Sequence, residues 1–163
     1  MTVQRVRTNR GDVFSVRVDA THKKYFQYVA RDMTQLNSNV IRIFKQKYSS
    51  RSKPDLLKIV SGKVDIHAHV IIMWGIKMKL WKKVGHVPYE AGSEALFRGS
   101  KDHSNPKIKL SHNWYVWKIN EPFQYVGKLE GEHKKADIGM VISPAGIVHR
   151  MRTGKYHFLY PNY

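Results

Sequence analysis

Residues 64–85 read VDIHAHVIIMWGIKMKLWKKVG, and this run decides the fold that the sequence predicts. In its first half, apolar residues at every second position alternate with Asp65, His67 and His69. A period of two is typical of a strand that packs one face on a core and leaves the other open. From Ile71 to Trp74 both faces are apolar, which indicates that the strand becomes covered there.

Alternation resumes directly after Gly75, so this glycine marks either a tight turn between two paired strands or a bulge in one bent strand. We therefore expect strands over 64–74 and 76–84 at the centre of a sheet. The second strand presents one polar face, made of Lys77, Lys79, Trp81 and Lys83.

Short alternating or β-branched runs, separated by polar turns, recur along the rest of the chain and predict an antiparallel meander. Residues 88–110 are rich in glycine and polar groups and predict a long surface loop. The further strands are expected at 13–19, 25–31, 40–48, 113–119, 123–126 and 155–160.

Two short helices are expected, at about 55–61 and 144–153. In the second, Ser143 is a good N-cap, Pro144 suits the first helical position and Gly154 suits the C′ position. Together these elements predict a single β-rich domain over residues 1–163. Its class is mainly β at the α+β margin, with a strongly bent antiparallel sheet or a partly open barrel.

Charge is the unusual feature of the composition. The 163 residues hold 29 Lys and Arg against 12 Asp and Glu, a formal net charge of +17 that favours an acidic macromolecular partner. Cysteine is absent, which excludes disulfides and thiolate chemistry. The sequence contains no apolar stretch of about 18 residues, so it predicts no membrane span. Its start lacks the apolar core of a signal peptide, and we therefore expect a cytoplasmic protein without a membrane partner.

The histidines of the first strand suggest one metal hypothesis. Asp65, His67 and His69 share a face, and His86 or His112 could complete a site. The alternative is an ordinary surface pair between Asp65 and His67. We expect no metal or other cofactor.

The lysine-rich face of residues 77–83 has three interpretations. It can be an edge strand that lysines protect from aggregation, a protein-binding surface or a nucleic-acid surface with an aromatic for stacking. Catalytic motifs are absent, and pairs such as His103 with Ser104 or Asp137 with His149 arise by chance in a chain with this many histidines. We therefore expect a binding protein and not an enzyme, a β-barrel enzyme with a histidine-bound metal being the remote alternative.

Several segments in order resemble a known family. They are Gly11–Val18 (GDVFSVRV), Lys24–Val29 (KYFQYV), Val40–Phe44 and Leu80–Pro88 (LWKKVGHVP). Together they resemble the bacterial polymorphic-toxin immunity family numbered twenty-six, over residues 11 to 119. The resemblance implies a small, β-rich cytoplasmic protein that neutralises a cognate toxin domain, without enzymatic activity or a cofactor.

The function we predict is occlusion of the toxin's active site by a β surface, with nucleic-acid binding as the alternative. The positive charge favours a toxin with an acidic surface. Aromatic anchors are expected to supply most of the affinity, and lysines to set the encounter rate. The anchors predicted are Trp81 and Trp117, and the charged fringe is Lys77, Lys79, Lys83, Lys107 and Lys109.

Overall fold

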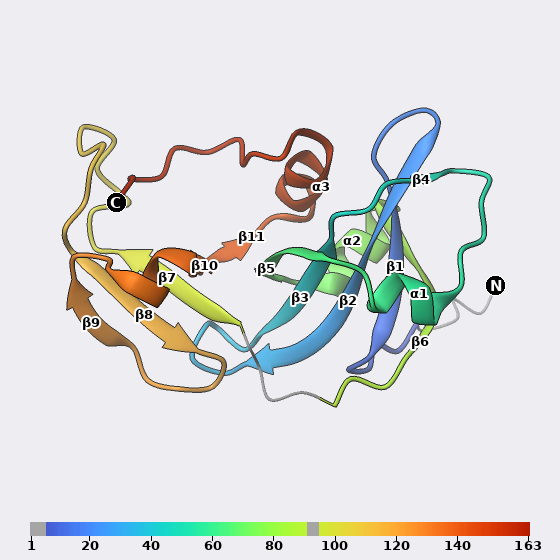
Figure 1. Ribbon diagram of the computed structural model, residues 1–163, viewed down its shortest axis with the longest axis horizontal. Coiled ribbons are helices and arrows are strands. Elements are labelled where there is room, and N and C mark those ends of the chain that lie inside the picture. Colours follow the sequence, from blue (N-terminus) through green and yellow to red (C-terminus); the bar gives the residue numbers. More distant parts are fainter. Residues whose placement is uncertain (1–5, 91–94) are drawn as a thin grey trace.

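A computed structural model of the protein describes residues 6–90 and 95–163 (Figure 1). Over these residues the fold is mainly β, with two sheets and three α-helices, and neither sheet closes into a barrel. The expected bent-sheet class is therefore confirmed, in its open form. The larger sheet, of order β11-β5-β3-β2-β1-β6 with β4 paired to β2, consists of β1 (Asp12–Arg17), β2 (His22–Asp32), β3 (Ser38–Phe44), β4 (Tyr48–Ser49), β5 (Val64–Val70), β6 (Trp81–His86) and β11 (Val141–Ile142).

A smaller sheet of order β10-β7-β8-β9 lies at the other end of the molecule (Figure 1). The short strands β10 and β11 join the two sheets, because β10 pairs in parallel with β7 and β11 pairs in parallel with β5. The strands of the smaller sheet are β7 (Leu96–Ser100), β8 (Trp114–Lys118), β9 (Gln124–Gly127) and β10 (Asp137–Ile138), and a 3-10 helix, η1 (Gly131–Lys135), precedes β10.

Both faces of the larger sheet are covered. On one face, buried side chains including Phe14, Phe26 and Ile41 pack with residues of α2 (Ile72–Lys77) and α3 (Pro144–Thr153). On the other face, Val13 and Phe44 pack beneath α1 (Leu56–Val60). Burial of each such side chain stabilises the fold by about 1.5–3 kcal/mol, so these layers hold the sheet in a fixed shape.

The helices at 56–60 and 144–153 confirm the sequence prediction. In α3 the Ser143 side chain accepts a hydrogen bond from the Gly146 amide at 3.1 Å. Gly154 ends the helix with φ of 78°, the left-handed conformation that glycine adopts without strain. In α1 the Asp55 side chain caps the Leu57 amide at 3.1 Å. Local capping chemistry thus fixes both boundaries.

The prediction that the first strand of this run continues to residue 74 is wrong. The chain leaves β5 at Val70 and forms α2, whose first amide, Ile72 N, donates to Asn39 Oδ1 at 3.0 Å. Gly75 is neither a turn nor a bulge. It gives room to the Trp81 indole, because a Cβ added at Gly75 would lie 2.0 Å from that ring. The Asn39 contact comes from a distant strand, the Trp81 contact from the residues that follow the helix, and together they override the local β pattern.

Two other strand predictions are corrected. The supposed loop 88–110 contains β7, which pairs with β8 from Leu96 opposite Lys118 to Ser100 opposite Trp114. The segment 155–160, predicted as a strand, belongs to no sheet. Its side chains nevertheless alternate in exposure, since Tyr156, Phe158 and Tyr160 are less exposed than the residues between them. This segment runs from α3 back toward the smaller sheet (Figure 1), and we call residues 154–163 the C-terminal strap.

Candidate functional site

A basic groove follows the β6 edge of the larger sheet. Two pockets, of about 490 and about 430 Å³, share the lining residues Ser15, Lys82 and Lys83 and so adjoin each other along this edge. Its cationic side chains come from β1, β2, β6, the turn after α2 and the loop before α1. We call this surface the basic groove; its cations are Arg17, Lys23, Lys53, Lys79, Lys82 and Lys83.

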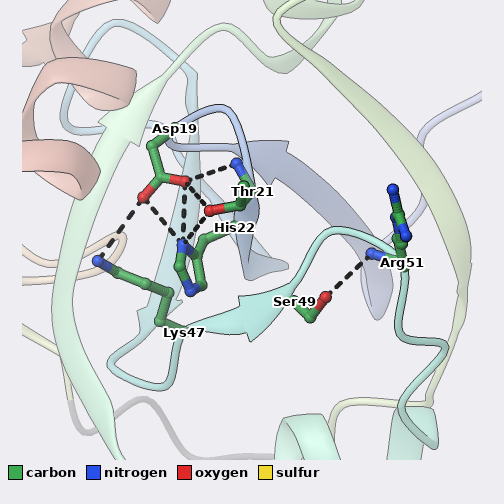
Figure 2. Close-up of polar contacts among 6 residues, drawn as sticks. All are labelled: Asp19, Thr21, His22, Lys47, Ser49 and Arg51. Atoms are coloured by element: carbon green, nitrogen blue, oxygen red, sulfur yellow. Dashed lines mark hydrogen bonds and ion pairs between the residues drawn. The ribbon is translucent and has the colours of Figure 1, made fainter.

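The β1–β2 hairpin places the first cations. Arg17 and Lys23 are paired across the hairpin, whose turn is held by the Asp19 carboxylate (Figure 2). That carboxylate accepts hydrogen bonds from the Thr21 amide at 2.8 Å and lies 3.0 Å from His22 Nδ1. The backbone hydrogen bond from Thr21 is the main cause that lowers the pKa of Asp19 to about 2. Asp19 therefore remains ionised and keeps the hairpin turn closed.

Further cations surround the same turn. Figure 2 shows Lys47 directed at Asp19, with Nζ 3.8 Å from Oδ2, and Arg51 beside Ser49 of β4. The Arg51 amide donates to Ser49 Oγ at 3.4 Å, while its guanidinium side chain is directed away from that contact. The region around the hairpin turn and β4 therefore carries cations in addition to those that line the groove.

Lys79 lies where α2 ends. Its amide donates to Ile76 O at 3.0 Å and the Leu80 amide donates to Gly75 O at 2.9 Å, the hydrogen-bond pattern of a Schellman motif. Lys79 holds the left-handed position of that motif, with φ of 58°. A residue with a Cβ is strained there by about 1–2 kcal/mol relative to the right-handed region, and glycine is the usual occupant.

The lysines of β6 differ in their partners. Lys83 Nζ lies 3.1 Å from Oδ2 of the fully buried Asp12, whose other oxygen lies 2.9 Å from His86 Nδ1. For Arg17, Lys23, Lys53, Lys79 and Lys82, no carboxylate of residues 6–90 and 95–163 lies within ion-pair distance. The groove therefore carries a positive charge that an acidic partner can neutralise.

Trp74 is an exposed aromatic residue on the helix that borders this groove. It lies on α2, where Ile76 lines the groove, and Lys79 in the turn that follows the helix lines the groove as well. Its side chain is 57% exposed and that of Met78, one turn further on, is 55% exposed. Tryptophan and methionine on a surface of this kind are typical of protein interfaces.

The structure brings together only part of the residue set predicted from the sequence. Lys79, Trp81 and Lys83 line the basic groove, but Lys77 lies on α2 and Lys79 in the turn after it, so the four do not form one strand face. The prediction that Trp81 is a surface anchor is wrong, because the side chain is buried. This residue is 4% exposed, and its indole N–H donates to Ile72 O at 3.0 Å.

The other predicted residues lie elsewhere. Trp117 is 2% exposed and belongs to the smaller sheet, so it cannot serve as a surface anchor either. Lys107 and Lys109 are exposed in the loop between β7 and β8, at the far end of the molecule from β6 (Figure 1). Neither lysine lines the basic groove.

The proposed metal ligands each have a protein partner. Asp65 Oδ2 accepts a hydrogen bond from Arg150 at 3.0 Å, and the ring of His67 lies 3.7 Å from Asp137. His69, expected on the open face, is fully buried against Asp32. Among residues 6–90 and 95–163, no group of three or more His, Cys, Asp or Glu side chains is arranged to hold a metal ion.

Asp32 is the centre of a buried network between the sheets. Its Oδ2 accepts from His69 Nε2 at 2.9 Å and from Trp117 Nε1 at 3.1 Å, and its Oδ1 accepts from the Asn120 amide at 3.0 Å. Burial opposes ionisation, but the hydrogen bonds from Thr34 and His69 outweigh it and lower the pKa of Asp32. Burial also lowers the pKa of His69, so we assign a neutral imidazole that donates from Nε2. This arrangement fastens the two sheets together.

Sequence reasoning missed most of the groove. Arg17, Lys23, Lys53 and Lys82 were not among the predicted site residues. One signal could have identified Arg17 and Lys23: both flank a short polar turn, and hairpin pairing brings such residues opposite each other. Trp74 was predicted to lie in a strand, and its exposure depends on α2.

Comparison of the chain with known protein families, curated proteins and solved structures finds no match. The fold and the groove define a basic, mainly β protein with an open charged edge. In the part of the chain that the structure describes, no helix has both the length and the apolar character needed to cross a membrane.

Proposed function

We propose that the protein is a binding protein of the cytoplasm that neutralises a toxin domain by covering an acidic surface of it. The basic groove contacts the acidic side chains of the toxin, and Trp74 with Met78 supplies the apolar anchor. The observation that carries this proposal is the groove itself, in which cations from separate elements line two adjoining pockets, while Trp74 is exposed on the helix that contributes Ile76 to one of them.

The chemistry of the surface supports a protein partner. Cations without carboxylate partners increase the rate of encounter with an acidic surface, and a large exposed aromatic side chain supplies affinity once water is expelled. The proposed mechanism needs no reaction by this chain. Because α1, α2 and α3 hold the sheet from both faces, the groove is preformed and binding costs little ordering of the chain.

The test is co-purification with, and inhibition of, the protein encoded by the neighbouring gene. We expect the double variant Lys79→Glu with Lys82→Glu to weaken binding strongly, since two attractive charges become repulsive. We expect Trp74→Ala to accelerate dissociation and to reduce the binding free energy by about 2 kcal/mol or more, as for an interface hot spot. The matched control is Lys107→Glu with Lys109→Glu, which makes the same change in net charge at the far end of the molecule and should leave binding nearly intact.

Retention of binding by the groove variant, or equal loss in the control, would contradict the proposal. The alternative partner is nucleic acid, since the groove cations also suit phosphate groups. Binding of mixed-sequence DNA or RNA that falls steeply between low and physiological salt, and that the groove variant abolishes, would favour this alternative.

A further inference from the structure

A second pocket, remote from the basic groove, lies where the two sheets meet under the C-terminal strap. Its volume is about 350 Å³, within the range of small-molecule sites. The walls come from β5, β7, β10, α3 and the strap, so the pocket exists only in the assembled fold. We call it the strap pocket.

Arg98 of β7 is the most constrained cation in this pocket. Its Nε donates to Ala136 O at 3.0 Å, and its Cζ lies 4.9 Å from the centre of the Trp114 ring and 5.1 Å from that of Tyr163. Its Nη1 is buried and, among the described residues, has no hydrogen-bond acceptor. The guanidinium is thus fixed in orientation before any ligand arrives.

Other donors in the strap pocket are also free. Lys155 lines it, and neither Lys155 nor Arg98 has a carboxylate within ion-pair distance in residues 6–90 and 95–163. The hydroxyl of Tyr156 makes no hydrogen bond with a described residue, and burial raises the pKa of this phenol, so it stays protonated and can donate.

Asp137 is an acidic group among the lining residues, and Asp65 is bonded to another lining residue, Arg150. Asp65 is paired with Arg150 at 3.0 Å. Asp137 Oδ2 accepts from the His67 amide at 2.9 Å. The remaining donors face a pocket with an excess of positive charge and apolar walls that include Ile66 and Phe158.

We propose that the strap pocket binds a small organic anion with a phosphate or carboxylate group and a compact apolar body. Arg98, Lys155 and the Tyr156 hydroxyl hold the anionic group. Ile66 and Phe158 contact the apolar body. This site is independent of the toxin-binding function proposed for the basic groove.

The test is isothermal titration of the full chain with phenyl phosphate and with benzoate, and with phenol as the uncharged control. We expect saturable one-to-one binding of at least one anion and none of phenol. Lys155→Gln should weaken it about tenfold, the order expected for loss of a hydrogen bond to a charged group. Tyr156→Phe should weaken it severalfold. Lys58→Gln, on the exposed face of α1, is the matched control and should have no effect.

Whichever anion binds more tightly identifies the headgroup. Absence of saturable binding by both anions, or equal binding of phenol, would overturn the proposal. An equal loss in Lys58→Gln and Lys155→Gln would overturn it too, since it would show that net charge and not the pocket attracts the anion. Arg98 is left unchanged in these variants because its packing on Trp114 makes any substitution a risk to folding.

Discussion

Asp32→Asn tests the network that joins the two sheets. The substitution keeps the shape of the side chain but replaces one acceptor oxygen by an NH₂ group. If that group takes the place of Oδ2, it faces His69 Nε2 and Trp117 Nε1, which lie 2.9 and 3.1 Å away and both donate. His69 can change its tautomer, but its Nδ1 is buried without a partner among the described residues and would then carry an unsatisfied proton.

The expected loss in the free energy of unfolding depends on how many buried hydrogen-bond donors lose their acceptors. In either tautomer the indole N–H of Trp117 and one imidazole N–H lack acceptors. An unsatisfied buried group costs about 1–3 kcal/mol, so the variant should lose about 2–6 kcal/mol of the free energy of unfolding. Because domains of ordinary stability have about 5–15 kcal/mol in total, this loss is large.

Equilibrium unfolding in urea, followed by far-ultraviolet circular dichroism, measures the effect. The midpoint should fall while the slope with denaturant stays the same. Asp55→Asn is the matched control: Asp55 is an exposed N-cap of α1, and asparagine caps a helix about as well as aspartate, so little change is expected. A loss below about 1 kcal/mol in Asp32→Asn would refute the assignment of Asp32 as an ionised acceptor of these hydrogen bonds.

Three further predictions concern residues described above. Gly75→Ala should destabilise the protein by about 1–3 kcal/mol in urea unfolding, because its methyl group overlaps the Trp81 ring; an unchanged midpoint would contradict that packing. Lys79→Gly should raise stability by up to about 1 kcal/mol in the same assay, by relief of the left-handed strain, while it weakens partner binding. Acidification should destabilise the fold in two stages, because the folded pKa values of His69 and Asp32 both lie below their ordinary values. The stability that neutral His69 contributes is lost as the pH drops below about 6.5. The stability that ionised Asp32 contributes is lost as the pH drops below about 4. Midpoints measured from pH 8 to 4.5 in the wild type and His69→Gln check the first stage, and a wild type that gains stability over that range relative to the variant would indicate an imidazolium instead.

Elements with local signals could be predicted from the sequence. The helix at 144–153 was predicted from its serine cap, its proline and its terminal glycine, and the structure shows those contacts. The strands near residues 13–19, 25–31 and 40–48 were predicted from alternation and short turns, and they form β1, β2 and β3. In each case the residues that determine the element lie within it or next to it.

The structure of residues 64–85 depends on tertiary contacts, one of them with a distant strand. Residues 72–77 form a helix because Asn39 of β3 accepts from the Ile72 amide and because Trp81 packs on Gly75. Neither contact can be seen in the apolar pattern of the run. The sequence pattern also predicted that the face of β5 that holds His69 is open to solvent. That face is buried because residues of other strands, including Asp32 and Phe97, cover it.

The basic groove required knowledge of the pairing. A high positive charge predicted an acidic partner but not where that partner contacts the chain. The cations gather because β1 lies between β2 and β6 and because α1 follows the loop that contains Lys53. Trp81 and Trp117 were predicted as anchors from the strand faces assigned to them, and burial removes both from the surface, whereas the helical turn exposes Trp74.

Protection of an edge strand does not account for all of these charges. β6 is an edge strand of the larger sheet, and lysines on such strands prevent pairing with other chains, which suffices to explain Lys82 and Lys83. Arg17 and Lys79 line the same groove from outside β6. Lys79 in particular occupies a backbone position that glycine would fill with less strain, and its side chain adds nothing to the hydrogen bonds that end α2. Edge protection and helix termination leave the charge of Lys79 unexplained, and the binding surface proposed for the groove gives a reason for it.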